Sequence, residues 1–422
     1  MNSFINESDF LKGNSAEDLA SQFGTPLYVY SEEILRSRMH NVSQVITKYP
    51  YTANYSVKAN TNLSILKLAI DENINCDAMS VGEMTLLLKA GMPEERIFFV
   101  PNNVSEEEIE FAIHNGIMTS LDSLCQLERY GEVCERLGLN EDDSARRCAV
   151  RINPGVGAGH HEKVVTGGKK TKFGISESDI DKIFEITKKY NLKIAGINQH
   201  IGSLFMEPTP YLEAVKNILR ISERFGKLEF IDFGGGYGIP YHKLDDEKEF
   251  PMQDFKAKLE VILDEFVEKV GYVPLFKSEP GRYCVAEGSL ILTRVHAVKE
   301  NNGICFAGCD CGMNVLVRPS MYDSWHDIEV IRDGKIVNRD NLKTQTVCGN
   351  ICESGDLLAK DRELPEIKKD DLLAVLDTGA YGWSMCSTYN SRPRPAEVMI
   401  CKDGSVKEIR RRETIEDLMR LF

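Results

Sequence analysis

The sequence predicts an eight-stranded α/β barrel followed by a second domain built of β-strands. Three observations support this prediction. Eight short apolar runs alternate with amphipathic stretches over the first two-thirds of the chain, and from about residue 290 only β-type runs follow. No glycine fingerprint of a doubly wound sheet follows the first run. The length of 422 residues exceeds one ordinary domain and agrees with two.

The first part of the chain contains the strands and helices expected of the barrel. The predicted strands cover 52–58, 73–78, 96–101, 117–122, 147–153, 194–201, 228–233 and 274–279. The predicted helices between them cover 62–72, 81–90, 105–114, 124–137, 177–190, 210–225 and 255–270. This alternation is typical of a barrel in which a helix follows each strand.

The last third of the chain has the spacing of a β domain. Its predicted strands cover 290–298, 304–309, 328–331, 343–348, 372–376 and 396–401, with a turn at Asp403-Gly404 and a final helix over 414–421. An earlier strand at 26–30 could belong to either part. We interpret the three arginines at 410–412 as a solvated strand edge rather than a binding patch.

Composition and charge exclude several classes of protein. The net charge is −14, and no basic cluster is interleaved with aromatic residues, so a nucleic-acid partner is not expected. The acidity is better explained by solubility. No apolar run approaches the ~20 residues that span a membrane, and the first residues lack a signal-peptide layout. We therefore expect a cytoplasmic protein without a membrane partner.

The twelve cysteines indicate reduced thiols rather than a disulfide framework. Cys309, Cys311, Cys348 and Cys352 could in principle offer four thiolates to zinc. Their spacing is unusual for a structural zinc site, and we prefer buried, neutral cysteines. No metal is expected.

Polar residues gather where the predicted barrel strands end. The carboxyl ends of barrel strands share one face, where catalytic groups are found. The side chains and glycines at these positions are Lys58, Asp77, Asn102, Asp122, Asn153, His200, Gly234, Gly235, Gly236 and Glu279. An amine, an imidazole, a glycine-rich turn and a carboxylate thus converge from distant parts of the chain.

Each of these groups also has a structural explanation. Lys58 is either an exposed cation or an amine that forms a Schiff base with a carbonyl cofactor. The glycines either make a tight turn or let backbone N–H groups approach a phosphate. His200 is either a buried histidine or a ring stacked on a planar cofactor, with the Ser203 hydroxyl near an anion. Glu279 and Arg282 could form a salt-bridged surface turn.

Six motifs resemble the fold-type III pyridoxal-phosphate decarboxylases, which include the diaminopimelate, ornithine and arginine decarboxylases. They are Tyr-Ser-Val-Lys-Ala-Asn (55–60), His-Ile-Gly-Ser (200–203), the glycines 234–236, Glu-Pro-Gly-Arg (279–282), and the segments 312–322 and 352–356. A seventh, Gly379-Ala-Tyr-Gly-Trp-Ser384, leads to Tyr389-Asn-Ser-Arg-Pro-Arg-Pro-Ala-Glu397. The last three are closest to the diaminopimelate decarboxylase branch.

The resemblance implies the domains and the cofactor. It implies an alanine-racemase-like (β/α)₈ barrel over 34–287, which binds pyridoxal 5′-phosphate. It also implies a β-sandwich or β-barrel domain over 1–33 plus 288–422, which contributes to a dimer interface and to the active site. The cofactor-binding residues that it implies are Lys58, Asp77, His200, Ser203, Gly234, Gly235, Gly236, Glu279, Gly281, Arg282 and Tyr381.

The resemblance also implies the catalytic groups Lys58, His200, Glu279 and Cys352. Lys58 would hold the cofactor as an imine, and the Glu279 carboxylate would keep the ring nitrogen protonated, which favours a decarboxylase over a racemase. Cys352, reaching in from the partner subunit, would protonate the quinonoid intermediate. The active enzyme would therefore be a homodimer with shared active sites.

By the same resemblance, the substrate-binding residues are Arg282, Arg318, Tyr322, Glu353 and Tyr381. The two arginines and Tyr322 would bind a distal carboxylate, which ornithine and lysine lack. Glu353 would accept the distal ammonium. The implied reaction converts meso-2,6-diaminopimelate into L-lysine and carbon dioxide, the last step of lysine biosynthesis.

Three departures from the family pattern leave alternatives open. Segment 160–174 carries four lysines and is either a solvated loop or a lid for another anionic substrate. Val315 and Trp383 stand where the family usually has a polar residue and phenylalanine. One alternative is a decarboxylase of another amino acid, or of a conjugated one, with a distal acidic group. The other is a non-catalytic pyridoxal-phosphate carrier or regulator, which could lose Cys352 and the substrate arginines.

Overall fold

The computed structural model describes residues 3–153, 155 and 171–422. Within it the chain divides into two units. The barrel unit comprises Met39–Gly238 and Glu249–Tyr283, and the β unit comprises Met1–Arg38, Ile239–Lys248 and Cys284–Phe422. Most of the lysine-rich segment 160–174 lies outside the described residues, so neither interpretation of that segment is tested.

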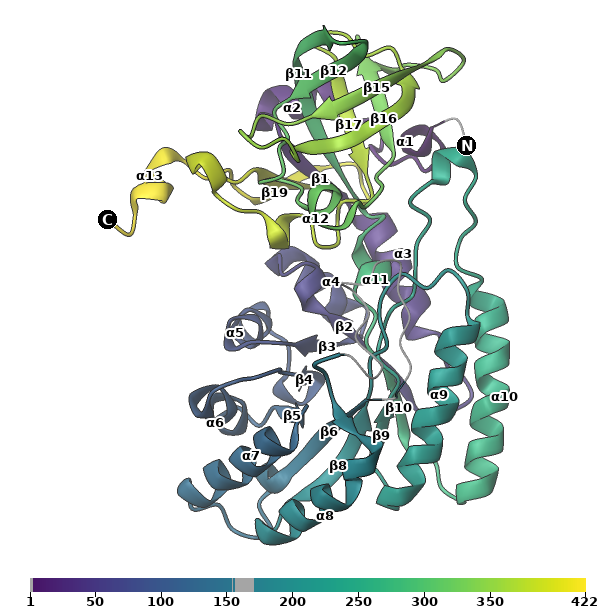
Figure 1. Cartoon of the computed structure of the whole chain (residues 1–422), viewed down its shortest axis with the longest axis vertical. Coiled ribbons are helices and arrows are strands. Elements are labelled where there is room, and N and C mark those ends of the chain that lie inside the picture. Colours follow the sequence, from purple (N-terminus) through teal and green to yellow (C-terminus); the bar gives the residue numbers. More distant parts are fainter. Residues whose placement is uncertain (1–2, 154, 156–170) are drawn as a thin grey trace. The chain divides into compact units, whose positions relative to one another are not determined.

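The barrel unit contains a closed ring of eight parallel strands (Figure 1). In ring order they are β2 (Tyr51–Ser56), β3 (Asn75–Ala78), β4 (Ile97–Phe99), β5 (Met118–Leu121), β6 (Arg147–Asn153), β8 (Lys193–Asn198), β9 (Phe230–Asp232) and β10 (Leu275–Ser278). The ring closes where Phe276 of β10 lies opposite Tyr51 of β2. The two-residue strand β7 (Ile175–Ser176) pairs beside β6. The predicted α/β barrel is confirmed.

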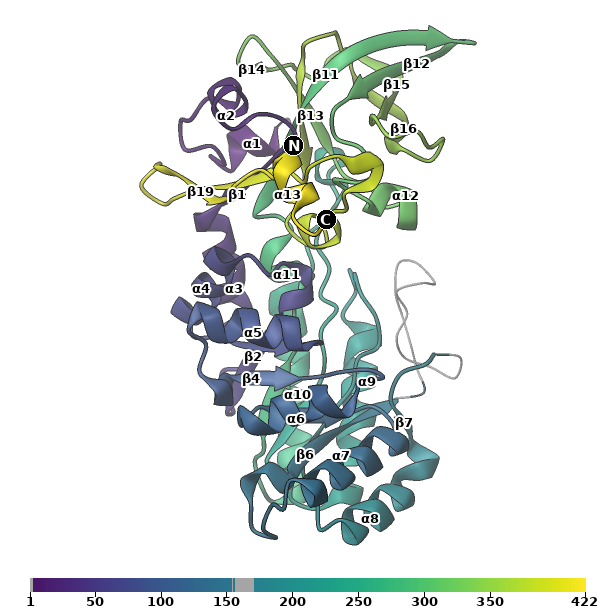
Figure 2. The ribbon, with the colours of Figure 1, turned by 90° about the vertical axis from the view of Figure 1, so that its left-hand side faces the viewer.

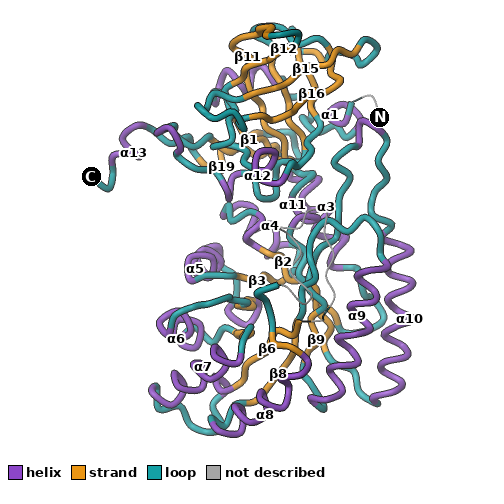
Figure 3. The backbone as a smooth tube through the Cα atoms, viewed as in Figure 1, coloured by secondary structure: helices purple, strands orange, loops and turns teal. Residues whose placement is uncertain are grey.

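Helices follow the strands and surround the ring, as the purple and orange segments of Figure 3 show. They are α4 (Leu63–Asp71), α5 (Val81–Ala90), α6 (Glu106–His114), α7 (Leu124–Arg136), α8 (Ile180–Lys189), α9 (Thr209–Ser222) and α10 (Met252–Val270). Ser80, Ser105 and Ser123 cap three of them, because each hydroxyl accepts a hydrogen bond from a backbone N–H of the first turn. All seven predicted helices are present.

Apolar and aromatic side chains from several barrel strands form a buried cluster. Phe98, Ala149, Ala195 and Phe230 belong to one buried cluster. Gly196 is required beside it, because a Cβ there would lie 2.5 Å from the Phe230 ring. This part of the interior is therefore a packed core, with the Lys277 ammonium 4.0 Å from the centre of the Phe230 ring.

The β unit contains one branched sheet of ten strands (Figure 2). Its main path runs β14 (Lys335–Ile336), β13 (Ile328–Arg332), β17 (Leu372–Leu376), β11 (Ser289–Asn301), β1 (Leu27–Ser31), β18 (Ala396–Ile400) and β19 (Val406–Arg410). The branch runs from β11 through β12 (Ile304–Cys309) and β15 (Leu342–Cys348) to β16 (Leu357–Pro365). The register of β11 shifts between Val295 and Ala297, where it passes into the branch.

The early strand β1 belongs to the β unit, which settles a question that the sequence left open. It pairs antiparallel with β11 and parallel with β18. Leu27 and Val29 join the buried core of this unit, whereas the hydroxyls of Tyr28 and Tyr30, on the opposite face, donate to the Val315 carbonyl and to Glu397. The two-residue period of a strand explains this division.

Three strands of the β unit were not predicted: β14, β16 and β19. In β16, the sequence Leu-Leu-Ala-Lys-Asp-Arg-Glu-Leu-Pro carries four charged residues and a proline. β16 pairs only with β15, so it is an edge strand, where charges and proline are tolerated. Edge position thus explains why its apolar pattern is weak.

Short helices complete the β unit. They are α1 (Phe4–Glu7), α2 (Ala16–Phe23), α12 (Arg318–Tyr322) and α13 (Ile415–Met419), while α3 (Glu32–Ser43) and α11 (Arg282–Val285) each run from one unit into the other. The predicted final helix corresponds to α13. Across the described residues, none of the helices combines the length and apolar character needed to cross a bilayer.

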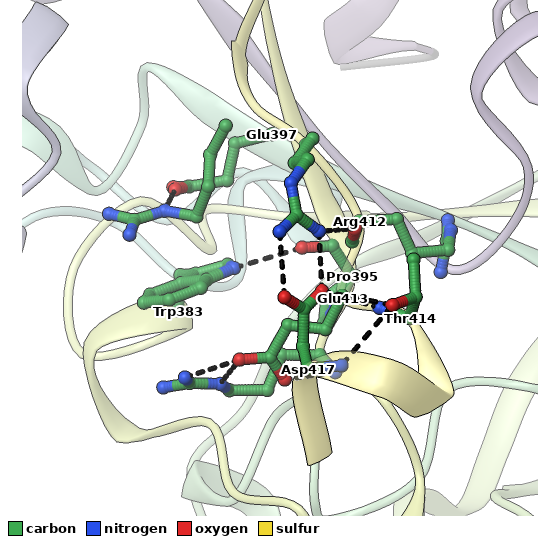
Figure 4. Close-up of polar contacts among 10 residues, drawn as sticks. Trp383, Pro395, Glu397, Arg412, Glu413, Thr414 and Asp417 are labelled. Atoms are coloured by element: carbon green, nitrogen blue, oxygen red, sulfur yellow. Dashed lines mark hydrogen bonds and ion pairs between the residues drawn. The ribbon is translucent and has the colours of Figure 1, made fainter. Parts of the chain in front are cut away.

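The three arginines at the end of edge strand β19 have separate, specific contacts, and Figure 4 draws those that involve Glu397 and Asp417. Arg410 forms an ion pair with Glu397, and its guanidinium lies 3.6 Å from the centre of the Trp383 ring. Arg412 donates to the carbonyls of Phe23 and Pro26. Only Arg411, paired with Asp417, is exposed. The three arginines do lie at a strand edge, as predicted. Of the three side chains, however, only that of Arg411 is exposed to solvent.

A buried ion cluster fastens the inserted segment Ile239–Lys248 to the rest of the β unit. The Lys243 ammonium lies 2.9 Å from Glu287 Oε1 and 2.7 Å from Asp377 Oδ1, and all three side chains are buried. Arg38 also pairs with Glu287, at 2.7 Å. Because unpaired charges are costly in a buried site, these contacts hold the segment in place.

Replacing Lys243 with methionine should destabilise the protein strongly. The change leaves two buried carboxylates without their ammonium partner, which costs about 3–5 kcal/mol. The measurement is the free energy of unfolding in urea. Lys258→Met is the matched control, because Lys258 forms an exposed pair with Asp254 on α10 that contributes at most ~0.5 kcal/mol. Equal losses in the two variants would contradict a stabilising role for the cluster.

Candidate active site

Lys58 lies just beyond the first barrel strand. β2 ends at Ser56, and Lys58 is the middle residue of a 3₁₀ turn, Val57–Ala59, so the predicted strand 52–58 ends two residues too late. Its side chain is half-buried, and its charge acts on Asp77, His200 and Glu279. The structure therefore excludes an ordinary surface lysine.

Asp77, at the end of β3, is fully buried. The Ser56 hydroxyl lies 2.6 Å from Asp77 Oδ1 and 3.1 Å from the Glu279 carbonyl oxygen. Burial and the charge of Glu279 raise the pKa of Asp77 well above its usual value, while Lys58 lowers it. A serine thus joins two predicted site segments.

His200 follows strand β8 and is held neutral. The Gly235 N–H donates to His200 Nδ1 at 3.3 Å. Burial and the positive charges of Lys58 and Arg151 keep the pKa of His200 well below its usual value. A neutral imidazole with an occupied Nδ1 suits stacking on a planar group better than it suits holding a proton.

The glycine turn after β9 is packed against two neighbouring backbones. A Cβ on Gly235 would lie 1.9 Å from the Glu279 carbonyl oxygen, and one on Gly234 would lie 2.2 Å from that of Gln199. Gly234 and Gly236 also have positive φ angles of 75° and 119°. The turn needs glycine for its own packing, whatever the turn binds.

Glu279 and Arg282 are both buried, with 5% of each exposed, so the alternative of a surface turn is wrong. Asn198 Nδ2 donates to Glu279 Oε1 at 3.3 Å. Arg282 donates from Nε and Nη2 to Ser203 Oγ, at 3.3 and 3.1 Å. The fold thus brings the predicted residues Ser203 and Arg282 into contact, and Gly281 is buried between Glu279 and Arg282 in the chain.

The buried carboxyl groups of the barrel resist ionisation. Burial raises the pKa of Glu279 to about 8, with a further contribution from Asp232, while Arg151 and Lys58 lower it. Burial likewise raises the pKa of Asp232 to about 7. The two carboxyl groups interact, since the charge of Asp232 is one cause of the raised pKa of Glu279. A carboxyl poised near neutrality can share a proton with a basic ring nitrogen.

Sequence reasoning missed four polar groups of this face: Asn54, Arg151, Asn198 and Asp232. Asn54 Nδ2 donates to Asp232 Oδ2 at 3.1 Å, and the Arg151 guanidinium lies 4.7 Å from the Phe173 ring. All four are buried. The sequence signal that could have found them is a polar residue inside an otherwise apolar strand. Such a buried residue normally has a hydrogen-bond partner or a ligand.

Three other predicted residues at strand ends, Asn102, Asp122 and Asn153, form hydrogen bonds with loop residues or with one another. Asn102 Nδ2 donates to Asp122 Oδ2. Asn153 donates to the Phe173 carbonyl at 3.0 Å and accepts from the Gly155 N–H at 3.0 Å. These contacts give each of the three residues a structural role, although Asp122 Oδ1 is buried without a hydrogen-bond partner among the described residues.

The barrel residues fit pyridoxal phosphate. Among the described residues, Asp77 Oδ2 and Arg151 Nη2 are buried without a hydrogen-bond partner, and such atoms cost about 1–3 kcal/mol each unless a ligand satisfies them. The same face offers an amine for a carbonyl, a neutral ring for stacking and a carboxyl for a ring nitrogen. Ser203 and Arg282 offer donors for a phosphate, whereas the Gly234 and Gly235 N–H groups of the glycine turn already donate to Asp232 and His200.

The remaining predicted residues belong to the β unit. Arg318 begins α12 and is 2% exposed, and Tyr322 ends this helix. Cys352 is exposed and its Sγ lies 3.3 Å from Asn390 Nδ2, while the neighbouring Glu353 accepts from the Tyr389 hydroxyl.

Tyr381 is half-buried with a positive φ of 57°. Such a conformation is uncommon for a tyrosine and typical of functional turns.

The zinc alternative has no support in these contacts. Cys309 and Cys311 are buried, and burial raises the pKa of Cys309 to about 12. Cys348 donates to the Ala307 carbonyl, and Cys352 is paired with Asn390. Among the described residues no cluster of histidine, cysteine or acidic side chains could hold a metal ion.

The sequence matches the family described as "Pyridoxal-dependent decarboxylase, pyridoxal binding domain" over residues 32–286. The diaminopimelate decarboxylase of Methanothermobacter thermautotrophicus is 40% identical over 97% of this chain and 94% of its own length. That of Aquifex aeolicus is 36% identical over 96% of this chain and 94% of its own.

Solved structures agree with these relatives. Diaminopimelate decarboxylase from Helicobacter pylori in complex with L-lysine has a TM-score of 0.87 at 33% identity and covers 96% of this chain and 98% of its own. The enzyme from M. jannaschii with L-lysine has a TM-score of 0.86 at 33% identity, covering 96% and 94%. A lysine/ornithine decarboxylase from Vibrio vulnificus, at 21% identity, shares the fold.

The raised pKa of Glu279 should make the stability of the cofactor-free protein fall as pH rises. Between about pH 4.5 and about 8 this carboxyl is protonated in the folded state and ionised in the unfolded state. Folding therefore takes up a proton, and raising the pH through this window weakens it. Glu279→Gln should make the fall of the urea unfolding midpoint between pH 5 and 8 shallower, while Asp232, whose pKa burial raises to about 7, still contributes to it.

Glu128→Gln is the matched control for this measurement. Glu128 lies on the surface, and its hydrogen bond to Lys189 lowers its pKa. Glu128 is therefore ionised in both the folded and the unfolded state above pH 5, and it adds no pH dependence to the stability there. Its variant should keep the wild-type slope of unfolding midpoint against pH. A wild-type slope in Glu279→Gln as well would show that Glu279 does not contribute to the pH dependence of stability.

Proposed function

The chain belongs to the diaminopimelate decarboxylases within the pyridoxal-dependent decarboxylase family, and on this premise we propose the roles of its residues. It is a pyridoxal-phosphate-dependent carboxy-lyase that converts meso-2,6-diaminopimelate into L-lysine and carbon dioxide. The observation that carries this conclusion is 40% identity over 97% of the chain to a diaminopimelate decarboxylase. The closed barrel and its polar face agree with it.

The barrel unit would hold the cofactor. When bound, pyridoxal phosphate supplies an electron sink for the carbon that loses carbon dioxide. The Lys58 amine would hold its carbonyl carbon, and the neutral His200 ring would stack on it. Ser203, Arg282 and the glycine turn would bind the phosphate.

Glu279 would control the proton on the ring nitrogen of the cofactor. Its carboxyl is buried, and its pKa of about 8 lies close to neutrality. A carboxyl of this kind, bonded to Asn198, shares a proton strongly with a nearby basic nitrogen and so keeps positive charge on the ring. An arginine at this position would do the opposite.

Cys352 would return a proton to the carbon that has lost its carboxylate. A thiol gives up a proton near neutral pH, and Asn390 Nδ2, 3.3 Å from Sγ, can donate to the resulting thiolate. We propose that Cys352 serves the active site of a partner subunit, in a homodimer with shared sites. The β unit would contribute to that interface.

Substrate selection would depend on the end of the molecule that does not react. Because meso-diaminopimelate has one D and one L centre and the product is L-lysine, the carboxylate is lost from the D centre. The L centre keeps its carboxylate and ammonium. Arg282, Arg318 and Tyr322 would bind this carboxylate, Glu353 would accept the ammonium, and Tyr381 would contact both cofactor and substrate.

The domain roles and the cellular location are part of the same proposal. Residues 34–287 would form the cofactor-binding domain, and 1–33 with 288–422 the domain for the dimer interface. A reducing compartment such as the cytoplasm suits the cysteines, since all twelve are free thiols. Small amino acids, rather than nucleic acids, suit the net charge of −14.

A substrate panel tests the reaction. The wild-type enzyme should release carbon dioxide from meso-diaminopimelate, and roughly a thousandfold or more slower from ornithine, lysine or arginine, which would leave buried charges unpaired. Lys58→Ala should release none. Borohydride reduction and peptide mapping should label Lys58, whereas Lys67→Ala, on the exposed side of α4, should behave as wild type. Rapid release from ornithine alone would contradict the assignment.

Mixing two inactive variants tests the shared site. Lys58→Ala and Cys352→Ala would each abolish activity in their own homodimers. After subunit exchange half of the dimers are mixed, and each has one intact site of two, so about one quarter of the wild-type activity should return. Each variant exchanged with itself is the control. No recovery, with mixed dimers verified by mass spectrometry, would place both residues in the site of one chain.

A further inference from the structure

We propose that His326 and Tyr241 are positioning residues that hold the Arg318 guanidinium in the orientation needed to bind the distal carboxylate. The inference rests on the proposed role of Arg318 and deepens it, because it names the groups that make this arginine selective. All of the residues involved belong to the β unit.

Arg318 is held by three hydrogen bonds to buried or half-buried groups. Its Nη1 donates to His326 Nε2 at 2.8 Å and to the Tyr241 hydroxyl at 3.1 Å. Its Nη2 donates to Ser324 Oγ at 3.3 Å. The guanidinium also lies 4.9 Å from the centre of the Tyr241 ring. These contacts approach the planar guanidinium from different directions and so fix its orientation.

The neighbours of His326 determine its tautomer and its charge. The Leu376 carbonyl can only accept a hydrogen bond, so His326 Nδ1, 2.7 Å away, carries the proton. The guanidinium can only donate, so Nε2 must accept. An imidazolium would direct an N–H at another N–H. His326 is therefore a neutral acceptor for Arg318.

The three described hydrogen-bond partners of the arginine are an imidazole and two hydroxyls. They fix the direction of the guanidinium without adding charge of their own. Pre-orientation also lowers the side-chain entropy lost when the ligand binds. The arrangement therefore suits a carboxylate that must be recognised in one place and one direction.

The segment that carries Tyr241 is itself fixed. The His242 ring stacks on Trp325 with 4.0 Å between centres, and the Leu244 N–H donates to Asp327 Oδ2 at 2.8 Å. The buried cluster around Lys243 fastens the same segment. Four successive residues, 241–244, thus contact residues 324–327 or the ion cluster, which leaves little freedom for the Tyr241 hydroxyl.

Two inhibitors separate recognition of the distal carboxylate from all other binding. L-Lysine, the product, keeps the carboxylate of the L centre, whereas cadaverine is the same chain without it. The ratio of their inhibition constants therefore measures how well the enzyme recognises this one group. A general loss of structure would weaken both inhibitors together and leave the ratio unchanged.

The experiment compares variants of the holoenzyme with meso-diaminopimelate as substrate. His326→Phe and Tyr241→Phe each remove one hydrogen bond to a charged group. Each should raise KM and the inhibition constant of L-lysine about tenfold, with little change in kcat or in the constant for cadaverine. His326→Gln, which can still accept from the arginine, should recover most of the affinity. Tyr130→Phe, which removes a buried hydroxyl bonded to the Ala145 carbonyl in the barrel, is the control.

Arg318→Met distinguishes failure of this inference from failure of the proposed function. If Arg318→Met lowers the preference for L-lysine over cadaverine but His326→Phe and Tyr241→Phe do not, the positioning role is overturned. If Arg318→Met leaves this preference unchanged, the role of the arginine itself is overturned. Equal weakening of L-lysine and cadaverine in His326→Phe would reduce His326 to a purely structural residue and also overturn the inference.

Discussion

The burial of Glu279 beside Asp232 is the constraint on which the chemistry of the barrel depends. A carboxyl removed from water and placed near a second one cannot ionise easily, and its pKa rises to about 8. The positive charges of Arg151 and Lys58 and the hydrogen bond from Asn198 lower the pKa of Glu279 and so offset part of this effect. The result is an acid whose proton is exchanged near neutral pH, in the part of the barrel where a cofactor ring would need one.

Close backbone packing supplies the second constraint. Gly234 and Gly235 leave no room for a Cβ, because the carbonyls of Gln199 and Glu279 lie against them. The same turn donates to His200 through the Gly235 N–H. The glycines, the histidine and the glutamate are thus one packed group, and a change in one segment would move the others.

The β unit also buries an ionisable side chain, in this case the positively charged Arg318. Arg318 is buried, and its three described hydrogen-bond partners, an imidazole and two hydroxyls, fix the direction of its guanidinium. In both units a neutral side chain forms a hydrogen bond with the charged or titratable group: Asn198 with Glu279, and His326 with Arg318. Function then depends also on residues outside the motifs, such as Asn198, Tyr241 and His326, which contact the motif residues in the fold.

The sequence by itself determined the eight barrel strands, their helices, the family and the motif residues, because strand and helix periods and short motifs are local properties of the chain. Tertiary structure alone decided that β1 joins the β unit, that edge strand β16 exists despite its charges, and that Glu279 and Arg282 are buried. It also brought Tyr241 and His326 to Arg318. Pairing, burial and pKa arise from contacts between residues distant in sequence, and no local pattern records such contacts.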